Sequence, residues 1–145
     1  MIIPDVNLLG YAYNAGAPAH SAARRWWEEL LSEDIAVRVP WTVCCGFVRI
    51  MTHPAVLIRP LDTSTALSHV RSWLTVETVE ILNPGPRHLE LLDRMLSAAG
   101  AGGNLVTDAH IAALALEYQA EVHSNDGDFC RFPGLRWRNP LATGF

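Results

Sequence analysis

Four aspartates stand at positions from which a folded chain could bring acids together for chemistry. They are Asp5, Asp108, Asp126 and Asp128. Asp5 directly follows a short apolar run that predicts a buried strand, and Asp126 and Asp128 lie in a turn after a second predicted strand, at residues 121–124. Asp108 lies at the start of a strongly apolar helix that leads into this second strand. Because the carboxyl ends of parallel strands meet at one edge of a sheet, we expect all four carboxylates to lie close together.

A cluster of this kind favours a hard divalent cation. Carboxylates held close together repel each other and raise each other's pKa values unless a cation neutralises them. Oxygen ligands suit Mg²⁺, with Mn²⁺ as a possible substitute, and such an ion can activate water and stabilise a phosphoryl oxyanion. The six histidines are scattered and the three cysteines lack zinc-ligand spacing. The acids therefore point to hydrolysis of a phosphodiester.

Each acid also has a purely structural explanation. Asp108 can be a first-turn acid of its helix, where the backbone amides favour a carboxylate, and Thr107 or Asn104 can cap the same helix. Asp126 or Asp128 can hold an Asx-turn or cap a short helix. The spacing alone leaves both explanations open.

Composition narrows the class of protein. With 145 residues and 50% hydrophobic content, the chain suits one domain with a substantial core, and we expect a single domain over residues 1–145. All eleven basic residues are Arg, which excludes lysine-dependent P-loop and Schiff-base chemistry. The net charge of −4 argues against binding duplex DNA through a broadly basic surface. Without an apparent membrane span, leader or disulfide framework, a cytoplasmic protein is expected.

Apolar runs and periodic patterns alternate along the chain. The runs predict strands at residues 1–4, 35–39, 79–82, 121–124 and 135–138. The periodic patterns predict helices at residues 6–13, 22–31, 41–51, 66–74, 89–99 and 108–116. This alternation predicts an α/β fold in which helices cover both faces of a parallel sheet.

Three acidic motifs together resemble the PIN-domain nucleases. They occupy residues 5–7, 104–115 and 124–129, and residues 129–140 look more narrowly like the VapC toxins of bacterial toxin–antitoxin pairs. The resemblance covers essentially the whole chain. It implies a PIN-like three-layer α/β/α sandwich with a five-stranded, mainly parallel sheet. It also implies a Mg²⁺-dependent endoribonuclease that is inhibited by a cognate VapB-type antitoxin.

The resemblance assigns roles to the acids by position. Asp5 and Asp108 match the principal metal ligands of the family, and Asp126 matches its third acid. Asp128 matches a further acid that many members have. All four are therefore predicted catalytic residues, the first three as metal ligands.

This sequence departs from the family in one helix. Many PIN nucleases have a Glu in the helix after the second strand, but residues 41–51 contain no acid, and a Cys thiol is a poor ligand for Mg²⁺. Either one ion is held firmly and a second only with substrate, or Asp128 supplies the missing charge. We expect activity to need high Mg²⁺, and a Glu at Cys44 or Cys45 to lower that requirement.

Substrate contacts are predicted for Arg49, Asn7 and Asn125. Arg49 can reach a substrate phosphate, although an ordinary solvated or ion-paired Arg is an equal alternative. The expected substrate is a loop of tRNA or rRNA, because unpaired bases are accessible there. The competing hypothesis is a catalytically weak or inactive PIN-like module that binds RNA or a protein partner, which the missing Glu suggests.

A homodimer is the expected assembly. The paired Trp26 and Trp27 of the second helix, together with other apolar helices, offer more hydrophobic surface than one side of a small sheet needs. The resemblance to VapC toxins points the same way.

Overall fold

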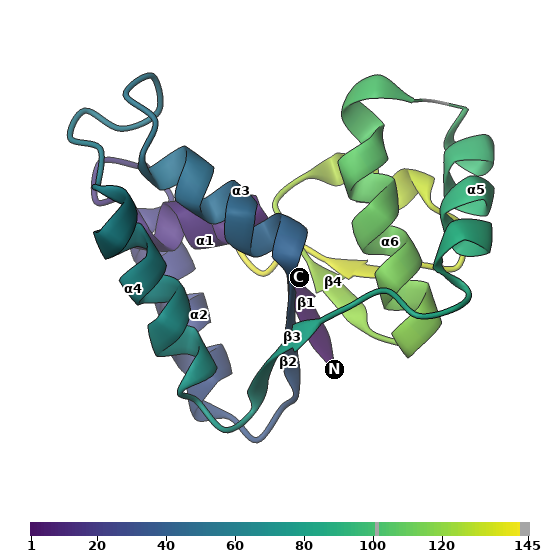
Figure 1. Cartoon of the computed structure of the whole chain (residues 1–145), viewed down its shortest axis with the longest axis horizontal. Coiled ribbons are helices and arrows are strands. Elements are labelled where there is room, and N and C mark those ends of the chain that lie inside the picture. The colour runs from purple at the N-terminus through teal and green to yellow at the C-terminus, as the bar shows by residue number, and fades with distance from the viewer. Residues whose placement is uncertain (101, 143–145) are drawn as a thin grey trace.

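The computed structural model describes residues 1–100 and 102–142, and a five-stranded sheet runs through its centre (Figure 1). The strands are β1 (Ile2–Pro4), β2 (Val37–Pro40), β3 (Val79–Leu82), β4 (Glu121–His123) and β5 (Arg136–Arg138). Their order is β3-β2-β1-β4-β5, and every neighbouring pair is parallel. The predicted α/β fold with a five-stranded parallel sheet is confirmed.

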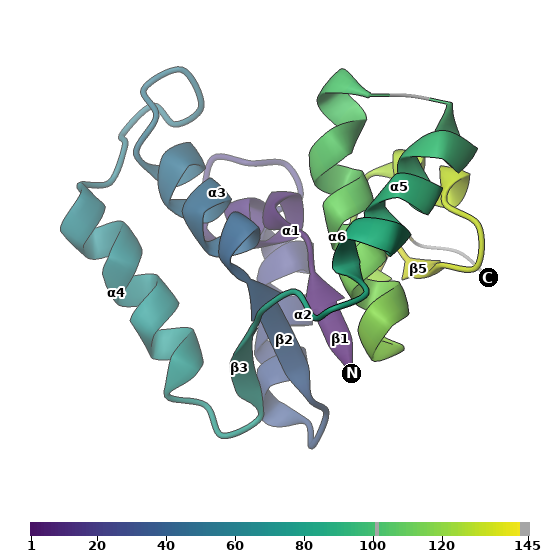
Figure 2. The same ribbon diagram turned by 45° about the vertical axis from the view of Figure 1, so that its right-hand side comes forward.

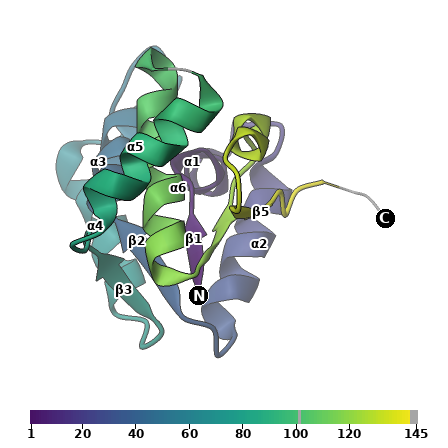
Figure 3. The same ribbon diagram turned by 90° about the vertical axis from the view of Figure 1, so that its right-hand side faces the viewer.

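Six α-helices cover the two faces of this sheet. They are α1 (Val6–Tyr13), α2 (His20–Ser32), α3 (Trp41–Met51), α4 (Thr63–Leu74), α5 (His88–Ala99) and α6 (Val106–Tyr118). Helix α5 packs on the outer side of α6 (Figure 2), and α2 lies on the opposite face of the sheet from both (Figure 3). Over the described residues, we find no helix with both the length and the apolar character that a bilayer crossing requires.

The central position of β1 brings distant parts of the sequence together. Burial on both faces explains its apolar sequence, and Ile3 is fully buried between the helix layers. In the parallel pairing of β1 with β4, Pro4 is in register with His123. The next residues, Asp5 and Ser124, therefore leave the sheet side by side at its carboxyl edge.

A capping residue explains the start of α4 and the end of α5, but not the start of α6. The carboxylate of Asp62 caps α4 by accepting a hydrogen bond from the Thr65 amide at 2.7 Å. Gly100 ends α5 with a φ of 65°, a left-handed conformation that favours glycine. The predicted cap of α6 at Thr107 or Asn104 is wrong, because a 3₁₀-helix, η1 (Gly103–Leu105), runs directly into α6 without a side-chain cap.

Tyr13, Trp27, Phe47 and Trp73 form an aromatic cluster that joins α1, α2, α3 and α4. The rings of Phe47 and Trp73 meet edge to face with centroids 4.8 Å apart. The Trp73 indole donates a hydrogen bond to the Tyr13 hydroxyl at 2.8 Å, so its polar atom is satisfied. Trp27 packs against Trp73 with centroids 5.7 Å apart.

Helix α2 does not provide the dimer surface that the sequence suggested. The side chains of Trp26 and Trp27 are only 9% and 3% exposed, because α2 packs them against the sheet and the aromatic cluster. Core packing explains these two residues, so they do not support the expected dimer, which stays a prediction.

Candidate metal centre

Three carboxylates converge at the carboxyl edge of the sheet. Asp108 lies in the first turn of α6, and Asp126 and Asp128 lie in the turn that follows β4. One oxygen atom from each carboxylate lies within 4.8 Å of the others. This separation allows all three to bind one divalent cation, since oxygen ligands surround Mg²⁺ at about 2.1 Å.

Asp5 lies beside these three acids, but its oxygens already have protein partners. It follows β1 and caps α1, with Oδ1 accepting a hydrogen bond from the Val6 amide at 2.8 Å. Its Oδ2 accepts a hydrogen bond from the Ser124 hydroxyl at 2.7 Å. The carboxylate is only 5% exposed, so these bonds fix its position in the interior.

Ser124 is a site residue that the sequence analysis did not single out. Besides donating to Asp5, its hydroxyl oxygen accepts a hydrogen bond from the Asp126 amide at 3.0 Å and one from the Asn7 side chain at 3.4 Å. One buried hydroxyl thus connects two of the acids across the edge of the sheet. The available signal was a small polar residue between the predicted strand and the turn that contains Asp126.

Asp126 and Asp128 combine the structural and the chemical explanations. Asp126 caps a short 3₁₀-helix, η2 (Gly127–Arg131), because its Oδ1 accepts a hydrogen bond from the Asp128 amide at 2.9 Å. This bond curls the turn so that the two carboxylates lie near Asp108. Capping and acid clustering are therefore two results of one local conformation.

The three predicted substrate contacts lie in different surroundings. Asn7 is at the site, where its amide nitrogen donates to Ser124 and its Oδ1 is buried without a hydrogen-bond partner among the described residues. Asn125 is exposed and accepts a hydrogen bond from Asn139 at 3.0 Å. Arg49 is exposed in the last turn of α3.

The electrostatics of the site favour a bound cation. The pKa of Asp108 is raised to about 7. Burial is the largest cause, and the negative charges of Asp5, Asp126 and Asp128 contribute the rest. Burial also raises the pKa of Asp5, although its hydrogen bonds from Ser124 and Val6 act in the opposite direction. Within the described residues, which are 1–100 and 102–142, no ion pair involves any of the four acids.

In the helix that lacks an acid, Gly46 packs against the start of α1, whereas the two cysteines lie in other surroundings. Cys44 is buried in the core, where burial raises the pKa of its thiol to about 11, and Cys45 is exposed to solvent. A Cβ atom on Gly46 would lie 3.2 Å from a methyl group of Val6, the residue that follows Asp5. A longer side chain at position 46 would therefore meet the start of α1, next to Asp5.

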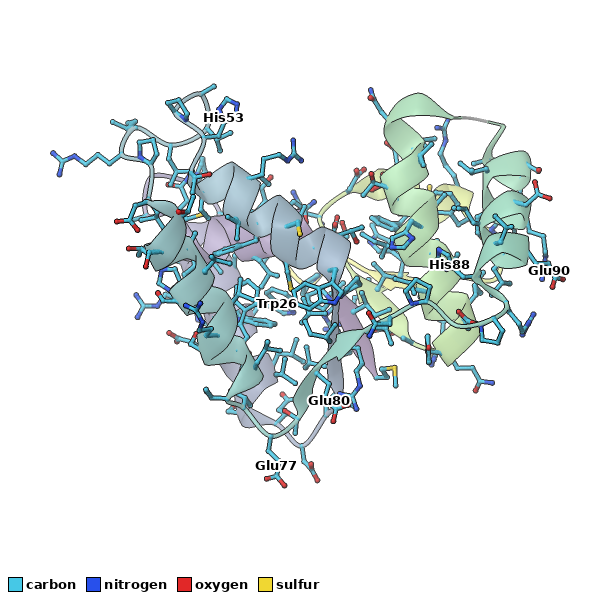
Figure 4. All side chains as sticks on the ribbon, viewed as in Figure 1. Trp26, His53, Glu77, Glu80, His88 and Glu90 are labelled. Atoms are coloured by element: carbon cyan, nitrogen blue, oxygen red, sulfur yellow. The ribbon has the colours of Figure 1, made fainter. Side chains whose placement is uncertain are left out.

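His110 is not a fourth ligand of this cluster. Its Nδ1 lies 2.8 Å from Nε2 of His88, a residue labelled in Figure 4, in a hydrogen bond between α6 and α5. This pairing turns the imidazole of His110 toward α5. His88 and His110 therefore form a hydrogen bond that joins α5 to α6.

Comparisons with known proteins agree with this geometry. A family model described as PIN domain matches residues 2–135. Ribonuclease VapC33 of Mycobacterium tuberculosis is 43% identical over 141 residues, which cover 97% of this chain and 99% of that protein.

Two solved structures share the fold. One is VapC20 of Mycobacterium tuberculosis, described as a sarcin–ricin loop cleaving toxin, with a TM-score of 0.66, 20% identity, and coverage of 94% of this chain and 99% of that one. The other is VapBC2 of Rickettsia felis bound to a promoter DNA fragment, with a TM-score of 0.68, 19% identity, and coverage of 96% and 98%. The chain therefore belongs to the PIN-domain family, within its VapC ribonuclease group.

Proposed function

We propose that this protein is the toxin of a type II toxin–antitoxin system, a Mg²⁺-dependent endoribonuclease that hydrolyses RNA phosphodiester bonds. The observation that supports this most directly is the group of four carboxylates at one sheet edge, with no cationic side chain paired to any of them in the described residues. Such a group is costly to ionise without a cation. Its all-oxygen donors fit Mg²⁺, with Mn²⁺ as a substitute.

Within this proposal the acids divide into two roles. Asp108 and Asp126 hold the cation together with Asp5, and Asp128 adds charge where other family members have the helix Glu. A bound Mg²⁺ would supply Lewis-acid stabilisation of the phosphoryl oxygens and a more acidic water. The buried Oδ1 of Asn7 has no hydrogen-bond donor within residues 1–100 and 102–142, so it can accept a hydrogen bond from water or substrate at the site.

The RNA and the partner follow from the relatives. VapC20 is described as cleaving the sarcin–ricin loop, and VapBC2 is a toxin–antitoxin complex. We infer an exposed loop of rRNA or tRNA as the substrate and a VapB-type antitoxin as the inhibitor. Loops suit the site because their backbone can bend toward recessed acids. Arg49 is exposed and is our candidate for a phosphate contact, with Asn125 beside the turn that holds Asp126.

We retain a cytoplasmic homodimer as a proposal. Cys44, Cys45 and Cys130 are free thiols, which fits a reducing compartment. With Trp26 and Trp27 buried, other apolar groups must form the contact, and Leu89 on α5 is 78% exposed. Light scattering of the purified protein at micromolar concentration is expected to give twice the chain mass, and a monomeric mass would contradict the dimer.

The function is tested by cleavage of RNA fragments that contain tRNA and rRNA loops. We expect purified protein to cut at a defined loop position with Mg²⁺ or Mn²⁺, to stop with EDTA, and to resume when excess metal is restored. The competing hypothesis of an inactive binding module predicts retention of RNA or of a protein partner without cleavage at any metal concentration. That result would overturn the proposed activity.

A further inference from the structure

A chain of hydrogen bonds, buried at Trp26 and His123 and partly exposed at Glu121, connects α2 to β4, the strand that precedes Ser124 and Asp126. The indole N–H of Trp26 donates to Nδ1 of His123 at 3.0 Å, and Nε2 of the same imidazole lies 2.8 Å from Oε1 of Glu121. His123 is 5% exposed, and Trp26 lies in the packed interior (Figure 4). This chain of hydrogen bonds therefore joins a core helix to two residues of β4.

The partners of His123 determine where its proton lies. An indole N–H can only donate, so Nδ1 must be unprotonated to accept from Trp26. The proton of the neutral ring is then on Nε2, from which it is donated to the Glu121 carboxylate. Burial lowers the pKa of His123 more than the Glu121 hydrogen bond raises it, which agrees with a neutral ring. One tautomer and one ring orientation satisfy both partners.

His123 is placed directly against the acid site. Its carbonyl oxygen accepts a hydrogen bond from the Asp5 amide at 2.9 Å. The next residue is Ser124, whose hydroxyl binds both the Asp5 carboxylate and the Asp126 amide. A shift or rotation of the backbone at His123 would therefore move a bond to each of these acids at once.

We propose that Trp26, His123 and Glu121 are positioning residues that hold the end of β4 so that Ser124 aligns Asp5 and Asp126 for metal binding. Groups that orient metal-binding side chains affect metal affinity by about 10- to 100-fold when they are removed. The proposal rests on the proposed function for its effect on catalysis. Its effect on the metal site can be measured without any RNA.

The chain supplies a matched control one residue away. Trp27 is also a buried tryptophan of α2, but its indole nitrogen has no hydrogen-bond partner among the described residues. Trp26→Phe and Trp27→Phe therefore remove the same atoms from neighbouring core positions. Only the first also removes the hydrogen bond to His123.

The experiment compares Mn²⁺ binding by the two variants with that of the full wild-type chain, using calorimetry with MnCl₂. We expect Trp26→Phe to weaken Mn²⁺ binding about 10-fold and to lower kcat with little change in KM. Trp27→Phe is expected to bind Mn²⁺ within about 2-fold of wild type, since it removes no bond to β4. Equal losses in both variants would mean that core packing alone is responsible, and the proposal would be overturned.

Substitutions at His123 give a second test that does not depend on Trp26→Phe folding. His123→Asn keeps an acceptor close to the position of Nδ1, whereas His123→Leu removes both nitrogen atoms. We expect the Asn variant to recover part of the Mn²⁺ affinity that the Leu variant loses. Wild-type Mn²⁺ affinity in His123→Leu would contradict the proposal.

The wild-type protein offers a spectroscopic check. ¹⁵N NMR of the imidazole should show His123 as the Nε2–H tautomer, and an Nδ1–H tautomer would exclude this chain of hydrogen bonds. If the wild-type protein binds Mn²⁺ but cuts no RNA, the proposed function fails. The binding and NMR comparisons still decide the role of Trp26, His123 and Glu121 in that case.

Discussion

The aromatic cluster formed by Tyr13, Trp27, Phe47 and Trp73 packs apolar rings with one internal hydrogen bond, whereas the acid site formed by Asp5, Asp108, Asp126 and Asp128 gathers charges of one sign. In the first region the contacts between the rings stabilise the folded protein. In the second, folding brings carboxylates into a half-buried place where they repel each other. The two regions lie on opposite sides of the balance of energies that keeps this one chain folded.

This contrast separates the groups that hold the fold together from those that carry the function. Removing a ring from the aromatic cluster should lower stability and affect activity only through folding. Removing a charge from the acid site should abolish activity and leave the metal-free protein as stable as before, or more stable. Four predictions test the separation.

The largest effect is expected for Asp108→Asn. Loss of a ligand and of one negative charge should lower metal-dependent cleavage by on the order of 100-fold or more. The melting temperature of the metal-free protein should stay the same or rise, because the variant relieves repulsion from three other acids. Cleavage assays and thermal unfolding in EDTA measure the two effects.

Asp93→Asn is the matched control for this charge change, since Asp93 is an exposed residue of α5 outside the acid site. It should change neither measurement. An unfolded Asp108→Asn variant, or one that cuts RNA at the wild-type rate, would make Asp108 a structural residue.

Trp73→Ala should damage the aromatic cluster. Trp73 is 1% exposed and contacts three other rings of this cluster, so its truncation should cost about 3–5 kcal/mol in the free energy of unfolding. Trp41→Ala is the control, because Trp41 is 54% exposed and its loss should cost less than about 0.5 kcal/mol. Urea unfolding in EDTA measures both, and equal costs would disprove the assignment of stability to the aromatic cluster.

The stability of the metal-free protein should fall as the pH rises from about 4 to about 7. The pKa of Asp108 is raised from 3.8 to about 7 on folding, so within this window the folded state binds a proton that the unfolded state has lost. After allowance for solvent screening, we expect a loss of about 1–2 kcal/mol from this group. Urea unfolding across the window in EDTA tests this, and Asp108→Asn should reduce the slope.

The smallest effect is expected from restoring a carboxylate to α3. Gly46→Glu should lower the Mg²⁺ concentration for half-maximal cleavage by about 2- to 5-fold, because position 46 faces Val6 beside Asp5. The added Cβ requires a small shift of Val6, and the better helix propensity of Glu offsets this by about 1 kcal/mol. Cys45→Glu adds the same charge at an exposed position. A similar improvement in both variants would indicate general electrostatics, not a ligand.

The sequence predicted those parts of the site that depend on local pattern. Two of the predicted strands are followed by an acid, Asp5 in one case and Asp126 in the other. Because parallel strands end at the same edge of a sheet, the sequence predicted that these two acids lie close together. Ser124 and Gly46 escaped prediction because their importance depends on neighbours far away in the sequence. The bond from Ser124 to Asp5 spans 119 residues, and Gly46 matters only because α3 packs on the start of α1. The start of α6 was misplaced because the preceding 3₁₀ turn replaces a side-chain cap.

The central place of β1 in the sheet also determines when the site can exist during synthesis. Asp5 is synthesised 119 residues before Ser124, the residue at the end of its partner strand β4 to which it is hydrogen-bonded. A nascent chain that stops before β4 can pair β1 with β2 and β2 with β3, yet it lacks Ser124 and two of the four acids. Translation must therefore pass β4 and the turn after it before any molecule can assemble this acid site.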